Sequence, residues 1–264
     1  MLTPTQLIQQ IASTTLRVVA VTDHDSTEGV AEAIEASTSH PRLTVIPGIE
    51  LGTANDESEL HLLGYFIDTE NANMQSKLEQ FRLERVDVAK AMVGKLAELK
   101  RPISWERVVE MAGGSVGRPH IARAMVEAGH VETVAEAFER FLGDKGVARV
   151  PRPKLLPVEA LEMIHGAGGV GVIAHPRTVD KLDGLVRQLV EVGLAGIEVY
   201  AEKYASARRD SYLDLATRYD LVSCGGTDYH ALGALNETTP GSNGPPPDTA
   251  SQLLERATTT HGEN

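Results

Sequence analysis

Short β-branched runs alternate with amphipathic stretches along much of the chain. The segment Leu2–Ala12 predicts a helix, because Thr3 can cap it and Pro4 fits its first position. The run Arg17–Val21 is apolar and β-branched, which predicts a buried strand. The same reasoning predicts strands at Leu43–Ile46, Leu60–Ile67, Val170–Ala174, Leu194–Tyr200 and Leu221–Cys224, and helices at Gly29–Ala36, Pro157–Ala167, Leu182–Val192, Tyr204–Tyr219 and Thr249–Ala257. Strands and helices that alternate at this interval indicate βαβ units with a parallel sheet.

The pattern changes between residues 71 and 156, where only helices are predicted. These helices are Met74–Leu99, Ser104–Met111, Pro119–Ala128 and Val134–Leu142. The Pro-rich run Pro151–Pro157 then forms a linker back to the alternating pattern. We therefore predict an α/β domain of residues 1–70 and 157–264, and a helical insert of residues 71–156 that covers the functional rim of the sheet.

Composition and charge exclude several classes of protein. The chain has 264 residues, of which 42% are hydrophobic, enough for a sizeable core and too many for a disordered protein. Its net charge of −12 argues against a broad basic surface, and so against stable binding of long nucleic-acid duplexes. We see neither an apolar run of about 18 residues, as a membrane span needs, nor a secretion signal near Met1. Because Cys224 is the single cysteine, an internal disulfide is excluded, and we expect a cytoplasmic protein without a membrane partner.

Polar side chains gather at the ends of the predicted strands. His24, His175 and His230 each come after a strand, and Glu50 closes another. In parallel α/β barrels the carboxyl ends of the strands meet at one rim, where catalytic residues collect. Imidazoles and carboxylates at such a rim suit divalent metals such as Mn²⁺, Fe²⁺ or Zn²⁺. Two such ions about 3.5–4 Å apart can hold a phosphate and activate water at neutral pH.

Each of these residues also has a structural interpretation. A histidine taken singly is more often hydrogen-bonded in a structural role than bound to a metal. Thr22–Asp25 alone fits a helix cap, and Gly226–His230 alone fits a turn. The combination favours a shared site, because an apolar barrel would not place several unpaired polar groups at its strand ends without a use.

Five motifs in a fixed order carry a family resemblance. They are Thr22–Asp25, Pro47–Glu50, His61–Tyr65, Ala174–Pro176 and Gly226–His230. In this order they resemble the PHP (polymerase and histidinol phosphatase) domain, most closely its stand-alone phosphoesterase branch. That branch includes enzymes that trim RNA 5′ ends and enzymes that hydrolyse 3′,5′-bisphosphonucleotides. Gly117–Ala122 and Gly241–Pro247 also match its pattern, so the resemblance covers almost the whole chain.

The resemblance implies a fold, a cofactor and a set of ligands. PHP domains have a distorted (β/α)₇ TIM-like barrel and usually two or three divalent metal ions. The positions of this chain that match family metal ligands are His24, Glu50, His61, His175, Asp228 and His230. Asp228 and His230 are also candidates for catalytic proton transfer, although metal binding competes for them. Mn²⁺ is the expected cofactor, with Fe²⁺ or Zn²⁺ as alternatives.

Three further residues have candidate roles. Arg118 and His120 match family residues that face the substrate phosphate, and the guanidinium fork suits that partner. The alternatives are a surface salt bridge for Arg118 and a first-turn helix position for His120. Glu198 ends a strand at the same rim, and we consider it a candidate for supporting a ligand rather than for binding metal.

The resemblance implies a metal-dependent phosphoesterase that acts through metal-activated water. Its substrates would be small phosphorylated molecules, such as nucleotides or short RNA ends. One alternative is a phosphatase of the histidinol-phosphate type. The other is a non-catalytic remnant that binds metal or nucleotide.

The remnant alternative comes from one departure from the family pattern. PHP domains open with a strand that carries Asp-Leu-His-x-His, followed by Ser-Asp-Gly, and this sequence has no such segment. Three of nine expected ligands and the first barrel strand are then missing, so fewer metals are expected. The strand near Val18–Val21 also loses a neighbour, and an open sheet edge invites association, including a homo-oligomer. Either the native protein is some 15–20 residues longer, or the chain is a genuine remnant with a reduced site.

Overall fold

The computed structural model describes residues 2–54, 59–112, 116–143, 145–151, 155–176, 179, 181–201, 204–230 and 239–261. The chain forms two compact units. Met1–Gln75 and Lys154–Asn264 make up the first unit, and Ser76–Pro153 makes up the second. The described strands all belong to the first unit, and the second unit is helical. The predicted role of the insert as a cover over the rim stays a prediction.

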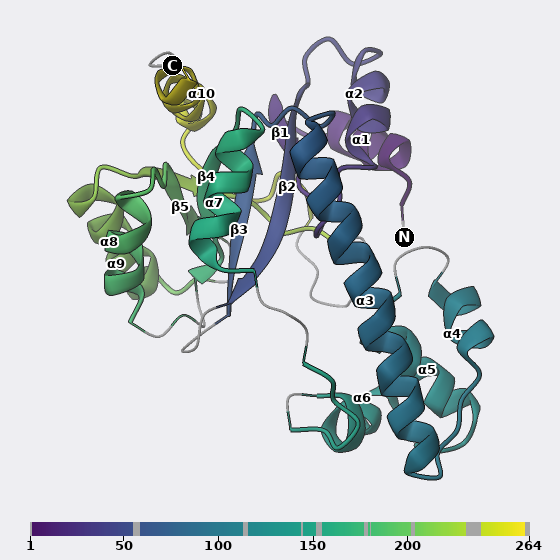
Figure 1. Ribbon diagram of the computed structural model, residues 1–264. Helices are drawn as coiled ribbons and strands as arrows, with labels where there is room; N and C mark the ends of the chain where they lie inside the picture. The colour runs from purple at the N-terminus through teal and green to yellow at the C-terminus, as the bar shows by residue number, and fades with distance from the viewer. Residues whose placement is uncertain are drawn as a thin grey trace. The chain divides into compact units, whose positions relative to one another are not determined.

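The first unit is built on one curled sheet of six described strands (Figure 1). The strands are β1 (Val18–Val21), β2 (Thr44–Ala54), β3 (Glu59–Tyr65), β4 (Val170–Ala174), β5 (Gly196–Tyr200) and β6 (Val222–Gly225). They lie side by side in the order in which they occur in the chain. A mixed α/β architecture is therefore confirmed, whereas a count of seven strand–helix units is not established by the described residues.

The direction of β3 differs from the prediction of a parallel sheet. β3 is antiparallel both to β2 and to β4, whereas β1–β2, β4–β5 and β5–β6 are parallel pairs. Only four residues separate β2 from β3 in the chain, and strands joined by so short a connection pair antiparallel, because a parallel pair needs a crossover of a dozen residues or more. The sheet is therefore mixed.

The extent of β2 also differs from the prediction, which ended this strand before Pro47. β2 continues through Pro47 to Ala54, so Glu50 lies inside the strand and does not close it. Pro47 is tolerated because β2 changes its pairing there. The parallel ladder to β1 ends at the pair Val21–Pro47, and the antiparallel ladder to β3 begins at Gly48. The missing N–H of the proline thus falls at the end of a ladder.

Helices cover both faces of this sheet. They are α1 (Pro4–Ala12), α2 (Val30–Ser37), α7 (Pro157–Gly166), α8 (Leu182–Val190), α9 (Ser206–Arg218) and α10 (Thr249–His261). The predicted cap of α1 is confirmed, because the Thr3 side chain accepts from the N–H of Gln6 and Gln6 accepts from the N–H of Thr3. Along β4, Gly171 faces Leu161 of α7, whereas Val172 packs in a cluster with Leu253 of α10. Alternate residues of a strand point to opposite faces, so α7 and α10 lie on opposite sides of β4.

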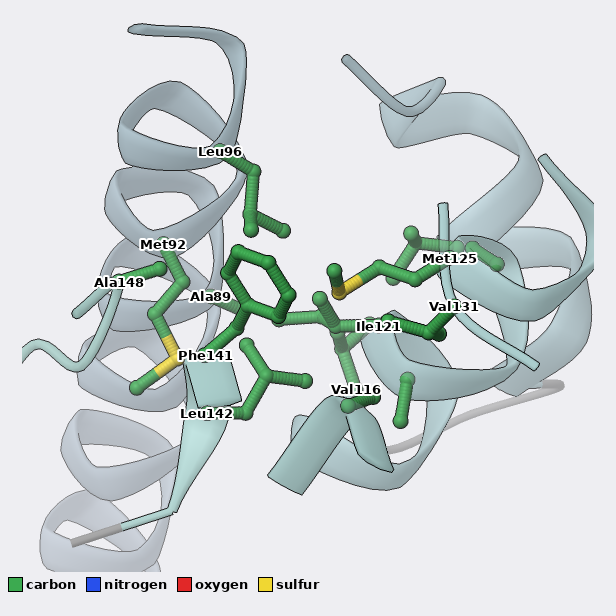
Figure 2. Close-up of a cluster of buried hydrophobic side chains, with 14 residues drawn as sticks. Ala89, Met92, Leu96, Val116, Ile121, Met125, Val131, Phe141, Leu142 and Ala148 are labelled. Carbon is green, nitrogen blue, oxygen red and sulfur yellow. The ribbon is translucent and has the colours of Figure 1, made fainter. Parts of the chain in front are cut away.

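The second unit has a hydrophobic core of its own. Its helices are α3 (Ala72–Glu98), which begins in the first unit, α4 (Trp105–Ala112), α5 (Arg118–Glu127), α6 (Val134–Ala137) and the π-helix η1 (Phe138–Leu142). Figure 2 shows side chains of α3, such as Leu96, packing with Ile121 and Met125 of α5 and with Leu142 of η1. Trp105, the single tryptophan of the chain, packs against this cluster.

The predicted helix Val134–Leu142 is two elements instead of one. It starts as α6 and widens into η1, where the N–H of Gly143 donates to the carbonyl of Phe138 at 2.7 Å. The wider turn lets Phe141 and Leu142 both reach the core of the second unit. Among the described helices, none is long and apolar enough to cross a membrane.

Candidate metal centre

Glu50 is the centre of a cluster of imidazoles. Its residue surface is only 4% exposed, and its carboxylate lies among three histidines from other segments of the chain. Oε1 is 2.6 Å from His61 Nδ1 and 2.9 Å from His175 Nε2, and Oε2 is 3.6 Å from His24 Nε2. One buried carboxylate thus joins a side chain of β3 (His61) with two that follow β1 and β4 (His24 and His175).

Backbone hydrogen bonds align His24 with Glu50. The N–H of Glu50 donates to the carbonyl of Asp23, and the N–H of Asp25 donates to the carbonyl of Glu50. His24 and Glu50 thereby form an isolated parallel bridge beyond the end of β1. The carboxylate of Asp25 also accepts from the N–H of Gly52 at 3.3 Å. The Asp25 carboxylate therefore helps to position the cluster, a role that strand-end reasoning does not reveal.

His61 reaches the cluster because β3 is antiparallel. It lies near the start of β3, paired with Gly52 of β2 and with Ala174 at the end of β4. His175 follows Ala174 directly, so the two imidazole rings meet, with centroids 4.9 Å apart. If β3 ran parallel to its neighbours, the same position would lie at the opposite end of the strands, away from His175.

His230 completes the ring of histidines. Its Nε2 atom lies 3.4 Å from Nε2 of His24, and its Nδ1 atom lies 2.9 Å from the carbonyl oxygen of Asp228. A carbonyl oxygen only accepts, so Nδ1 of His230 carries a proton and the neutral ring keeps its lone pair on Nε2. The Asp228 carboxylate lies 3.5 Å from His230 Nδ1, on a backbone with φ +50°. The structure thus brings all six predicted ligand residues into one region of the first unit.

The charges in the centre depend on Glu50. Burial alone would raise the pKa of Glu50, but hydrogen bonds with His175 and His61 and the charge of His24 outweigh it and lower the pKa well below its ordinary value. The hydrogen bond to Glu50 raises the pKa of His175, whereas burial lowers the pKa of His24. The centre therefore combines an ionised carboxylate with an imidazole that favours its neutral, ligand-competent form.

The donor atoms fit a divalent cation. One ligand atom each from His24, Glu50 and His61 lie within 4.8 Å of one another. Imidazole nitrogens and carboxylate oxygens are the ligands of Zn²⁺ and related transition metals. The facing Nε2 atoms of His24 and His230 can be satisfied either by one shared proton or by a common cation.

Glu198 contacts this centre through the backbone of His175. It is 8% exposed, lies in β5, and its Oε2 accepts from the backbone N–H of His175 at 2.8 Å. Burial raises the pKa of Glu198 to about 7. The signal in the sequence is a single acidic residue inside the apolar run Gly196–Tyr200, since buried carboxyl groups need a partner.

Arg118 and His120 belong to the second unit, at the start of α5. Arg118 Nη1 donates to the carbonyl of Leu142 at 3.4 Å, and its guanidinium lies over the Phe138 ring. Nδ1 of His120 accepts from the N–H of Gly117 at 3.1 Å, which supports its structural interpretation as a first-turn residue. Their assignment to substrate binding stays a prediction.

Comparison with known proteins identifies the family. No profile of a known protein family matches the chain. The 5′-3′ exoribonuclease Rnm of Salmonella typhimurium is 30% identical over 236 residues, which cover 87% of this chain and 80% of that protein. A 3′,5′-nucleoside bisphosphate phosphatase of Chromobacterium violaceum is 28% identical over 242 residues, which cover 88% and 83% respectively.

A solved structure agrees with these relatives. The crystal structure of a protein from Bifidobacterium adolescentis, assigned as a metal-dependent phosphoesterase, matches with a TM-score of 0.81 and 32% identity. The match covers 97% of this chain and 91% of that one. The chain therefore belongs to the PHP-type phosphoesterase family, whose members hydrolyse phosphate esters.

Proposed function

We propose that this protein is a metal-dependent phosphoesterase that hydrolyses phosphate esters of nucleotides or of short RNA ends. The observation that carries the proposal is the buried carboxylate of Glu50, shared by imidazoles from three separate segments of the chain. A buried anion ringed by histidines is costly in a structural core, and it is an effective way to hold cations. The relatives named above act on RNA or on nucleoside bisphosphates, which supports this class of substrate.

The residues proposed to hold the metal ions are those that gather around Glu50. They are His24, Glu50, His61, His175, Asp228 and His230. A divalent cation at such a site would polarise phosphoryl oxygens and lower the pKa of water. Mn²⁺ is the proposed metal, and Fe²⁺ and Zn²⁺ are the alternatives to be tested.

The side chains of the chain have separable tasks in this proposal. Glu50 orients the imidazoles of His61 and His175 through its hydrogen bonds, and its negative charge would help to hold the metal ions. His230 presents the lone pair of Nε2, because its Nδ1 proton is held by the Asp228 carbonyl. That lone pair can serve as a ligand or accept a proton during the reaction. Arg118 and His120 are proposed to bind substrate phosphate.

Metal dependence and substrate choice can be tested together. Metal-stripped protein is assayed for phosphate release with added Mn²⁺, Fe²⁺ or Zn²⁺, on a 3′,5′-bisphosphonucleotide, a short 5′-phosphorylated RNA and histidinol phosphate. The proposal expects turnover of at least one of the first two substrates, only with metal. Turnover of histidinol phosphate alone would overturn the substrate assignment. Metal binding without turnover of any substrate would overturn the enzyme assignment in favour of a binding remnant.

A further inference from the structure

Glu198 stands out among the buried residues, because none of the proposed tasks uses it. It lies in the middle of β5, between β4 and β6, in the strand Gly196–Tyr200 whose other side chains are apolar or aromatic. A carboxyl group that is 8% exposed is costly to bury. Its Oε2 accepts from the backbone N–H of His175 at 2.8 Å. A functional reason for its position therefore has to be sought at His175.

The backbone of His175 is unusual. Its φ angle is +23°, outside the regions that residues with a Cβ ordinarily adopt. Such conformations persist only where the surrounding structure holds them. The hydrogen bond from the His175 N–H to Glu198 is a contact that holds this backbone conformation. It fixes the peptide that precedes the His175 side chain.

The other end of His175 meets Glu50. Its Nε2 atom lies 2.9 Å from Glu50 Oε1. Two buried carboxylates therefore contact His175, one at its backbone N–H and one at its ring. Glu198 holds the main chain of His175, and Glu50 holds its ring. Without the contact to Glu198, the backbone of His175 can relax toward negative φ, and the ring then loses its direction toward Glu50.

We infer that Glu198 is a positioning residue of the metal centre, acting through the main chain of His175. This inference rests on the proposed function, because it treats the cluster around Glu50 as a metal site. Outer contacts that orient metal-binding histidines are commonly worth 10–100-fold in metal affinity. Glu198 differs from the usual case in holding a backbone amide instead of the second ring nitrogen.

The test compares three substitutions that separate length from charge. In Glu198→Gln, the side-chain amide oxygen can accept the same hydrogen bond without a negative charge. In Glu198→Asp, the charge remains but the side chain is one methylene too short. In Glu198→Ala, both the negative charge and the hydrogen-bond acceptor are lost. We expect Mn²⁺ affinity, measured by titration of the metal-stripped protein, to fall about 10–100-fold in the Ala and Asp variants and to stay within about threefold of wild type in the Gln variant.

A second readout does not depend on metal. The His175 amide proton is followed by NMR in the metal-free protein, where a hydrogen bond to Glu198 shifts it downfield. We expect it to move upfield in the Ala and Asp variants and to stay in place in the Gln variant. This readout remains informative if the wild-type protein binds no metal, a result that would overturn the proposed function and leave the positioning contact to be judged on its own.

A double-mutant cycle shows whether the effect passes through His175. In the background of His175→Ala, Glu198→Ala should change Mn²⁺ affinity by less than about threefold, because the residue it positions is gone. An equal loss in both backgrounds, or rescue by Asp instead of Gln, would overturn the inference in favour of a direct ligand or charge role. Unchanged metal affinity in all three single variants would overturn it in favour of a purely structural role.

Discussion

His61 Nδ1 lies 2.6 Å from Glu50 Oε1, across the antiparallel ladder that joins β3 to β2. The two residues are near each other in the chain, yet their contact depends on the direction of β3. Because β3 is antiparallel, His61 lies at the same end of the strands as His175 and His24. The consequences of this arrangement can be measured.

Replacement of Glu50 should disable the centre. Glu50→Gln removes the negative charge that the surrounding imidazoles share, so we expect Mn²⁺ affinity and phosphate release to fall by about 100-fold or more. The matched control is Glu35→Gln, the same chemical change on the exposed surface of α2, which should leave both unchanged. A Glu50→Gln variant with full metal affinity would contradict the assignment of this carboxylate as a metal ligand.

Replacement of Arg118 tests the predicted phosphate contact. If the guanidinium binds substrate phosphate, Arg118→Lys should raise KM about tenfold, because an ammonium group cannot form the two parallel hydrogen bonds. Binding of Mn²⁺ in the absence of substrate should be unaffected. Steady-state kinetics on the preferred substrate check this expectation. Unchanged KM and kcat would contradict the substrate role and favour a structural role through the contacts of Arg118 with Leu142 and Phe138.

Gly225 is required where β5 and β6 approach each other. A Cβ at this position would lie 2.2 Å from the carbonyl oxygen of Tyr200, which is main chain and cannot turn away. We expect Gly225→Ala to lower the melting temperature and to weaken metal binding, because it displaces the segment that carries Asp228 and His230. Gly184→Ala is the control, since nothing lies within 4 Å of a Cβ there and alanine favours a helix by roughly 0.5–1 kcal/mol. Equal melting temperatures for the two variants would show that β6 has room to move.

The core of the second unit should be sensitive to truncation. Leu142 is fully buried in it, so Leu142→Ala should lower the free energy of unfolding by about 2–5 kcal/mol. Leu83 on α3 is 58% exposed, so Leu83→Ala should change that free energy by less than about 0.5 kcal/mol. Urea unfolding of the full chain measures both. Similar values for the two would indicate that the cluster in Figure 2 does not stabilise the protein.

The thiol of Cys224 should report on folding. Burial, with the nearby charge of Glu198, raises the pKa of Cys224, so the reactive thiolate is scarce at neutral and mildly alkaline pH. We expect almost no reaction with a thiol reagent at pH 8 in the native protein and rapid reaction in urea, where the pKa returns to its ordinary value. Rapid reaction of the native protein would mean that β6 opens readily. The same assay checks that each variant above is folded.

Much of the architecture follows from local patterns. The run Val170–Ala174 is a strand with the predicted bounds, and the cap at Thr3 forms as its residue type indicates. The polar residues at strand ends also identify the candidate site, because His24, His175 and His230 do come together there. The strand and the cap depend on neighbours in the chain, and the strand-end positions of the histidines are visible in the pattern, so a single sequence is enough to predict them.

Other features of the centre depend on how the strands pair. The apolar alternation of a strand is the same in either direction, and the reversal of β3, which delivers His61, follows from its short connection to β2. The pattern of apolar residues misses that connection, because it ends the β2 strand before Pro47. The continuation of β2 through Pro47 required a change of partner strand, and the His175 backbone with positive φ donates its N–H to the carboxylate of Glu198 from β5. Residue types and their periodicity therefore define which side chains can bind a cation. Hydrogen bonds between strands far apart in the chain decide how those side chains face one another, because pairing energy depends on the partner and not on the strand alone.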